Sequence, residues 1–435
     1  MNTELQLDSM TNRGHVICVS SYKMEAPSKA KFWLLTGVLF LAVGLNGVSD
    51  TLRSVMYPNI KDALGLSATQ YGVLQGMVQF SYVVWAFAIA GGVRYTGYKM
   101  GFIYACIISI VGYIATFFCN NFFTILTCQF FATCILGALD DGPSSFAVLI
   151  FTKYPATLYS IMSGCYGFGA FIGPLYATLV NHVSSGNYKS MSIAMTIPIA
   201  LGIIVFLIVP FYRNYPETKE ETEKTPTVSI WKYIFSPMVW YGSFMINMMA
   251  NAERSTLNWG TLYFEEMYQM TEDDGAKLNS TFYFCFMIAR FVGGFITDRV
   301  GPFLMEYIII PVGMVIYLIG FIMGKSGFHI LPFVGFFVSL YWPTCIIAFT
   351  RYWKDNSATP ISVILPIQSL IGMVVQVLLG VVNDHFGPQY AYWSAIPFCI
   401  ISLLMIIGFH FIVLRKEKKE EALLSKDTTT EVLVQ

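Results

Sequence analysis

Charged residues are scarce in this chain. Of its 435 residues, 12% are charged, whereas 55% are apolar and 16% are aromatic. Soluble domains carry about 25% charged residues, so roughly half of the charge that keeps a folded surface in water is missing here. A formal net charge of zero also provides no overall field for binding nucleic acid or acidic partners. This composition excludes an ordinary water-soluble domain and predicts a protein embedded in a lipid bilayer.

Clusters of reactive side chains are also lacking. The nine cysteines are scattered, mostly within apolar stretches, and none has the spacing of a disulfide framework or a metal site. The five histidines are dispersed as well. Because no nucleophile–base set, metal cluster or phosphate-binding loop is visible, we expect no enzyme activity, no metal and no cofactor.

Long apolar stretches recur along the whole chain. About 20 apolar residues cross the hydrocarbon layer as one helix, because backbone groups there must hydrogen-bond within their own segment. The predicted spans are 32–56, 69–93, 100–118, 122–150, 156–181, 190–212, 237–262, 277–297, 304–324, 328–350, 359–382 and 389–413. The sequence therefore predicts an all-α membrane protein with twelve transmembrane helices.

A hydrophilic segment at the middle of the chain divides these spans six and six. Its prolines and charged side chains suit a linker between two bundles that move relative to each other, although a plain solvated loop fits equally well. The predicted organisation is a cytoplasmic N-terminal tail (1–31), a first bundle (32–212), a cytoplasmic linker (213–230), a second bundle (231–414) and a cytoplasmic C-terminal tail (415–435).

The distribution of basic residues among the loops predicts the orientation. With a cytoplasmic N-terminus, the cytoplasmic segments hold 19 Lys and Arg residues and the opposite loops hold 4. Lys and Arg are concentrated in the cytoplasmic loops of membrane proteins. Both termini are therefore expected in the cytoplasm, with the protein in the plasma membrane or an internal membrane.

Two loops share a repeated spacing of glycine, aspartate and glycine. Gly294-Phe-Ile-Thr-Asp298-Arg299-Val-Gly301 ends the eighth predicted span, and Gly380-Val-Val-Asn-Asp384-His-Phe-Gly387 ends the eleventh. The first glycine allows close helix contact, the last allows a tight turn, and the aspartate can cap a helix N-terminus. In the corresponding first-half turn, Arg94 stands in the place of the aspartate and Lys99 follows it.

These motifs resemble those of the major facilitator superfamily, which carries them between spans two and three and between spans eight and nine. The resemblance implies two six-helix bundles that open a central cavity alternately to each side, with these loops latching the cytoplasmic gate. The predicted gating residues are Lys99, Arg290, Asp298, Arg299 and Asp384. For Arg290, one turn before Gly294, a gate salt bridge is favoured over contact with the substrate.

Ionisable residues inside the predicted spans indicate a function by default, because each costs roughly 2.5–3.5 kcal/mol at the bilayer centre. They are Asp50, Arg53, Asp140, Asp141, Glu253, Arg254 and Arg290. Adjacent carboxylates cannot both ionise cheaply in a cavity of low dielectric constant. Asp140 and Asp141 are therefore the main candidates for proton coupling, with Asp50 and Glu253 as further candidates. The alternative is that one of the paired acids forms a structural ion pair with an arginine.

Polar side chains within the spans suit recognition of a polyol, because amides donate and accept hydrogen bonds and an indole can stack on a sugar face. The predicted substrate-binding residues are Asn46, Gln75, Gln79, Asn251, Trp259 and Gln368, together with Arg254. Hydrogen bonding between neighbouring helices is the competing explanation for each of these side chains.

A closer resemblance is to the fucose/glucose–proton symporter branch of the superfamily. It rests on Gln70-Tyr-Gly72-Val-Leu-Gln75, Gly97-Tyr98-Lys99-Met-Gly101, Gly137-Ala-Leu-Asp140, Ala252-Glu253 and Pro343-Thr344. The resemblance implies that Asp140 occupies the position of a proton-linked glutamate. Span five departs from the branch, because Ser163-Gly-Cys-Tyr166-Gly-Phe-Gly169 stands where the sugar transporters have Gln and Asn. Fucose or glucose itself is therefore not predicted.

The leading hypothesis is a monomeric secondary transporter that moves a small polar solute, with a monosaccharide as one candidate, by proton symport. One alternative is a uniporter or exporter of an organic anion or amino acid, in which Arg53 or Arg254 would hold a carboxylate. A membrane solute sensor that does not transport is a further alternative. The expected partners are the solute, a proton and the lipid bilayer, and no nucleic acid.

Overall fold

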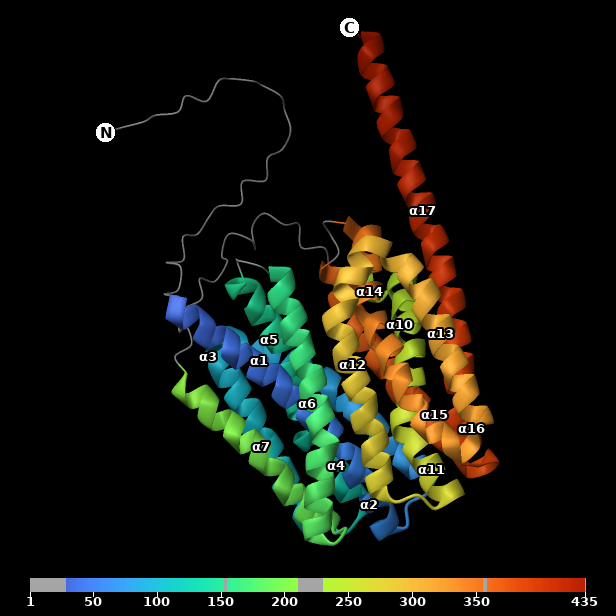
Figure 1. Cartoon of the computed structure of the whole chain (residues 1–435). Helices are drawn as coiled ribbons and strands as arrows, with labels where there is room; N and C mark the ends of the chain where they lie inside the picture. The colour runs from blue at the N-terminus through green and yellow to red at the C-terminus, as the bar shows by residue number, and fades with distance from the viewer. Residues whose placement is uncertain (1–28, 152–154, 210–229, 355–357, 435) are drawn as a thin grey trace, which may run out of the picture.

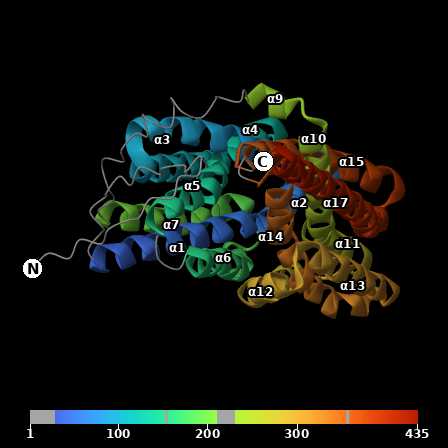
Figure 2. The same cartoon turned by 90° about the horizontal axis from the view of Figure 1, so that it is seen from above.

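A computed structural model describes residues 29–151, 155–209, 230–354 and 358–434 of the chain. Within these residues all regular structure is helical, as predicted. Figure 1 shows the helices of residues 29–208 on one side and those of residues 230–434 on the other. The view from above shows the same division into two bundles (Figure 2). The predicted N-terminal tail up to residue 28 and the predicted linker up to residue 229 lie outside the described residues.

The first half is built from helices broken at specific points. Its helices are α1 (Lys29–Thr51), α2 (Arg53–Leu64), α3 (Ala68–Phe118), α4 (Phe122–Ala132), α5 (Cys134–Ile150), α6 (Pro155–Ser184) and α7 (Tyr188–Ile208). The first and fourth predicted spans each consist of two helices, which meet at Leu52 and Thr133. α3 covers two predicted spans and bends between them at Gly97, where the φ of 78° suits a residue without a Cβ atom.

The second half has a π-helical interruption beside charged residues. Its helices are α9 (Ile230–Ile234), α10 (Pro237–Arg254), the π turn η1 (Ser255–Gly260), α11 (Thr261–Tyr268), α12 (Glu272–Val300), α13 (Pro302–Ile322), the 3₁₀ turns η2 (Gly324–His329) and η3 (Leu331–Phe333), α14 (Val334–Trp353), α15 (Ala358–Phe386), α16 (Pro388–Trp393) and α17 (Ala395–Val434). The π turn directly follows Glu253 and Arg254, and such turns often lie at functional sites.

Nine helical segments of the described residues are long and apolar enough to cross a membrane. They coincide with predicted spans one to four, six, and nine to twelve. The remaining predicted spans correspond to α6, to α10 with η1 and α11, and to α12. Nine segments therefore have the length and composition of membrane spans, and the count of twelve stays a prediction.

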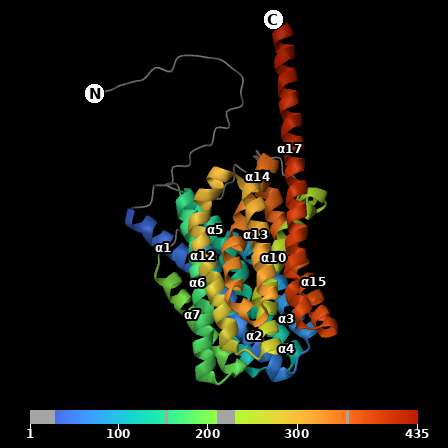
Figure 3. The same cartoon turned by 45° about the vertical axis from the view of Figure 1, so that its right-hand side comes forward.

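The outer surface of the bundles is apolar, as a lipid environment requires. On α7, large apolar side chains at helical spacing are exposed, namely Ile193, Ile197, Leu201, Ile204 and Ile208. Figure 3 shows α17 extending well beyond the end of the bundle. The predicted C-terminal tail, 415–435, is thus helical as far as Val434.

The two halves meet along two helix pairs, α3 with α15 and α6 with α12. Glycines allow the first approach: a Cβ atom on Gly72 would lie 2.5 Å from the carbonyl oxygen of Gln376, and one on Gly380 would lie 2.5 Å from that of Ala68. In the second pair, a Cβ atom on Gly164 would lie 2.3 Å from the Phe291 ring. Gly380 therefore has the role predicted for the first glycine of its motif.

Candidate substrate cavity

A cavity of about 800 Å³ lies between the two halves of the molecule. Its walls come from α1, α2, α3, α5 and α6 of the first half and from α10, η1, α12, α14 and α15 of the second. The predicted site residues on these walls are Asn46, Asp50, Gln75, Gln79, Asp140, Glu253, Arg254, Arg290 and Gln368. The side chains of Asp141 and Asp298 lie outside the described part of the chain.

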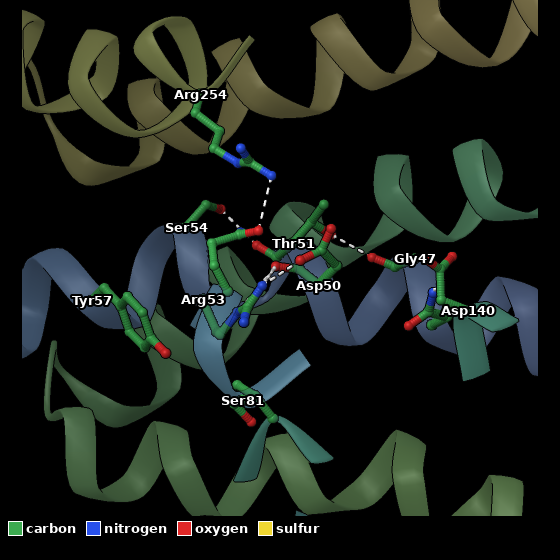
Figure 4. Close-up of polar contacts among 12 residues, drawn as sticks. Gly47, Asp50, Thr51, Arg53, Ser54, Tyr57, Ser81, Asp140 and Arg254 are labelled. Carbon is green, nitrogen blue, oxygen red and sulfur yellow. Dashed lines mark hydrogen bonds and ion pairs between the residues drawn. The ribbon is translucent and has the colours of Figure 1, made fainter. Parts of the chain in front are cut away.

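Asp50 and Arg53 form an ion pair where α1 gives way to α2. An Nη2–Oδ1 contact joins them, and the same Arg53 nitrogen donates to the backbone oxygen of Asp50 at 2.9 Å. The other carboxylate oxygen, Oδ2, accepts from the Tyr166 hydroxyl at 2.6 Å. Figure 4 shows the pair, with Arg254 pointing towards this region from the second half. The Asp50 charge is therefore neutralised within the wall.

Asp140 accepts hydrogen bonds from two uncharged side chains. Its Oδ2 accepts from the Tyr82 hydroxyl at 2.9 Å, and its Oδ1 is 3.4 Å from Nδ2 of Asn46. The carboxylate is exposed to the cavity. Tyr82 and Asn46 belong to α3 and α1, so three helices of the first half converge on this group.

Glu253 and Arg254 both border the cavity. Arg254 crosses to the first half, where its Nη2 donates to Oε1 of Gln79 at 3.0 Å, while its buried Nη1 has no partner among the described residues. Within the described chain, no hydrogen bond or ion pair is made by the Glu253 carboxylate; its charge is opposed at longer range by Arg254 and Arg290. Glu253 is thus a cavity acid without a fixed donor.

Arg290 on α12 borders the cavity and reaches Ser163 on the neighbouring helix α6. Its Nη1 donates to the Ser163 hydroxyl at 2.5 Å, and its guanidinium lies 4.7 Å from the centre of the Phe286 ring. It also interacts electrostatically with Glu253 and Asp140. In this conformation its described partner is a hydroxyl rather than the carboxylate expected of a gate salt bridge.

Asn251 and Trp259, two of the predicted substrate-binding residues, lie behind the wall. Both side chains are completely buried. The indole Nε1 of Trp259 donates to Oε1 of Gln376 at 3.1 Å, and Nε2 of Gln376 donates to Oδ1 of Asn251 at 3.0 Å. Nδ2 of Asn251 in turn donates to Oδ1 of Asn247 at 2.6 Å. Because an indole can only donate, this chain of bonds fixes the orientation of Gln376, which does line the cavity.

The cavity is closed at one end by polar contacts between the halves. The Asp384 carboxylate accepts the backbone N–H groups of Ala68 and Thr69 at 2.8 and 2.7 Å, so the aspartate caps the N-terminus of α3. At the same end, Lys61 pairs with Glu266 at 2.9 Å. This is the end that carries α2, α11 and α16 (Figure 1).

Two other predicted gating residues, Lys99 and Arg299, lie towards the opposite end of the molecule from Asp384. Lys99 donates to the carbonyl oxygens of Leu207 and Val209 at 2.9 and 3.0 Å, so it caps α7 within the first half. Arg299 is exposed near the end of α12. The cavity lining extends in this direction, to Tyr159 and Thr297. Asp384 and the loop of Arg299 therefore lie at opposite ends of the cavity, and their gating roles stay predictions.

Several cavity residues were not among the predicted site residues. They are Tyr82, Ser163, Tyr166 and Gln376. Hydroxyl and amide side chains are common within spans, so only the contacts with Asp140, Arg290, Asp50 and Trp259 reveal their roles. Glu306 in α13 was also missed, although a single acid in an apolar span is itself a signal.

Comparison with known proteins agrees with this geometry. The family description “Major Facilitator Superfamily” matches residues 39–334. Two Helicobacter pylori proteins named “Putative glucose/galactose transporter”, from strains J99 and 26695, are 22% and 21% identical over 411 residues, covering 89% of this chain and 97% of each relative.

Solved structures share the fold. The transporter FucP in its outward conformation has a TM-score of 0.59 at 18% identity, covering 88% of this chain and 99% of its own. A bacterial homologue of the human lysosomal transporter Spinster, inward-facing and unoccupied, has a TM-score of 0.65 at 18% identity, covering 89% and 98%. The family match spans more than half of the sequence. The chain therefore belongs to the major facilitator superfamily, and it is a multi-pass membrane transporter rather than an enzyme.

Proposed function

We propose that this transporter moves a small polar solute, with a monosaccharide as the leading candidate, in symport with a proton. The observation that carries the proposal is the Asp140 carboxylate on the cavity wall, held by Tyr82 and Asn46. Two relatives are named as glucose/galactose transporters, and a structural neighbour is described as the Escherichia coli fucose:proton symporter. Both names agree with a cavity that carries hydroxyl, amide and charged side chains on its walls.

Asp140 is the best candidate for carrying the proton. Asp50 already has a cationic partner in Arg53, so protonating Asp50 would leave the buried Arg53 guanidinium without an anionic partner. Asp140, by contrast, accepts from a phenol and an amide. The Asp140 carboxyl group is exposed to the cavity, where it can take up and release a proton. Glu253 is the second candidate, since no described donor fixes it.

Alternating access is the mechanism proposed for coupling. The end with Asp384 is closed by contacts between the halves, and the cavity extends towards the other end. If both termini are cytoplasmic, as the loop charges predict, this conformation faces the cytoplasm. Loss of the Asp384 contacts, with closure around Arg299, would expose the cavity to the opposite side. The working unit is proposed to be the monomer.

The test is solute accumulation in proteoliposomes with an imposed proton gradient. Wild-type protein should accumulate a radiolabelled monosaccharide, and dissipating the gradient should abolish the accumulation. Asp140→Asn should lose gradient-driven accumulation while solute exchange remains. Asp62→Asn, which changes an exposed carboxylate at the end of α2, is the matched control and should behave like wild type. Intact accumulation by Asp140→Asn would remove Asp140 from the mechanism.

Transport of an organic anion or amino acid is the second candidate function. It is favoured by Arg254 and Arg290, which border the cavity without an acid within 4.0 Å among the described residues. Competition by sugars and by amino acids against one bound solute separates the two candidates. A protein that binds solute but shows no flux in vesicles would instead be a sensor.

A further inference from the structure

Glu306 is a carboxyl group buried in the second half, outside the cavity. It lies on α13 and its side chain is 0% exposed. The hydroxyl of Thr344 and the thiol of Cys345, both on α14, contact its Oε1. Its Oε2 has no partner, and no basic nitrogen lies within 4.0 Å among the described residues. The surroundings of this acid are therefore those of an uncharged group.

The hydrogen bonds of the Thr344 hydroxyl also indicate that Glu306 is uncharged. Its hydroxyl has one proton to donate. Besides Glu306, the hydroxyl lies 2.8 Å from the carbonyl oxygens of both Leu340 and Tyr341, which can only accept. If the hydroxyl proton is shared by these carbonyls, the contact with Oε1 requires a proton on Glu306. An ionised carboxylate here would be both buried and unpaired, which is the costlier arrangement.

Glu306 contacts α14 next to a proline that borders the cavity. Pro343 has no N–H group, so α14 lacks one internal hydrogen bond at this point. Trp342, Pro343 and Ile346 line the cavity on the other side of the helix. Glu306 therefore contacts this weakened turn of α14 on the face of the helix away from the cavity. A small displacement of the turn would move the cavity wall.

We propose that Glu306 keeps its proton throughout transport and acts as a positioning residue, joining α13 to the proline turn of α14. The donor is the Glu306 hydroxyl and the acceptor is Oγ1 of Thr344. This role adds to the proposed function and differs from that of Asp140, because the proton on Glu306 is not the one transported.

The test compares Glu306→Gln with Glu306→Leu by solute exchange, which needs no proton gradient and so remains informative if proton symport is wrong. Glutamine keeps a neutral donor of the same length, so KM and maximal rate should stay within about twofold of wild type and the pH profile should be unchanged. Leucine keeps the volume but loses the donor. The maximal rate of Glu306→Leu should therefore fall about twofold to tenfold, which corresponds to the free energy of one hydrogen bond. Its KM should change less.

Thr344→Val is the second variant, because it removes the acceptor while keeping the side-chain shape. It should lower the maximal rate by the same factor as Glu306→Leu. The double variant Glu306→Leu with Thr344→Val should have a maximal rate no lower than that of either single variant. Glu417→Gln, on the exposed part of α17, is the control for loss of a carboxylate. The proposal is overturned if Glu306→Gln unfolds, if it loses accumulation while exchange persists, or if Glu306→Leu matches wild type.

Discussion

The carboxylate of Asp384 on α15 caps α3 of the other half by accepting the backbone N–H of Thr69 at 2.7 Å. A charged acceptor at a helix N-terminus gains from both the hydrogen bond and the helix dipole. Because donor and acceptor belong to different halves, this stabilisation exists only while that end of the transporter is closed.

Asp384→Asn should therefore favour conformations in which this end is open. Spin labels at Asp62 and Gln269, exposed positions on the two halves, should show longer distances in the variant, measured by double electron–electron resonance in a cysteine-depleted background. Glu417→Gln, which alters an ion pair within the second half, should leave the distances unchanged. Identical distributions in Asp384→Asn and the parent protein would mean that the cap does not hold the gate.

Gly72→Ala should disturb the contact between α3 and α15. The added Cβ atom would lie 2.5 Å from the carbonyl oxygen of Gln376, which is backbone and cannot swing away. Overpacking of this kind costs about 1–3 kcal/mol, so the unfolding temperature of the detergent-solubilised protein should fall. Gly37→Ala is the matched control, since nothing lies within 4 Å of its new Cβ atom. Equal unfolding temperatures for the two variants would contradict the close packing.

Trp259→Phe should weaken solute binding without direct contact with the solute. The variant keeps an aromatic ring but removes the N–H group that orients Gln376. One lost hydrogen bond predicts a KM increase of about twofold to tenfold, with the protein still folded. In Trp240→Phe, whose indole bonds to the backbone of Ile234 away from the cavity, KM should not change. An unaltered KM in Trp259→Phe would show that Gln376 is oriented by other contacts.

Asp50→Asn should destabilise the protein more than the double change Asp50→Asn with Arg53→Gln. The single variant leaves the Arg53 guanidinium, which is largely buried, without its anionic partner, a change that costs about 3–5 kcal/mol in buried pairs. The double variant removes both charges together. Unfolding followed by tryptophan fluorescence provides the comparison. Additive losses from the two single changes would argue against direct coupling between these side chains.

Composition and hydropathy alone determined the class of this protein. Scarce charge and repeated apolar stretches leave helices as the way to satisfy backbone groups in lipid, and the glycine–aspartate–glycine motifs indicated the family. They also identified acids that line the cavity, such as Asp50, Asp140 and Glu253, because a charge inside an apolar span is visible without knowing its neighbours.

The tertiary structure decided which of these residues face the cavity and which support it. Asn251 and Trp259 are polar residues within a span, as are Gln75 and Gln79. Their side chains, however, are buried between helices, where they orient Gln376 through hydrogen bonds. Whether Asp50 is neutralised, and whether Asp384 bridges the two halves, depends on residues brought together by folding. The sequence shows that a polar group lies within a membrane span, where its burial is costly. The partner of that group is determined only when helices distant in the sequence pack together.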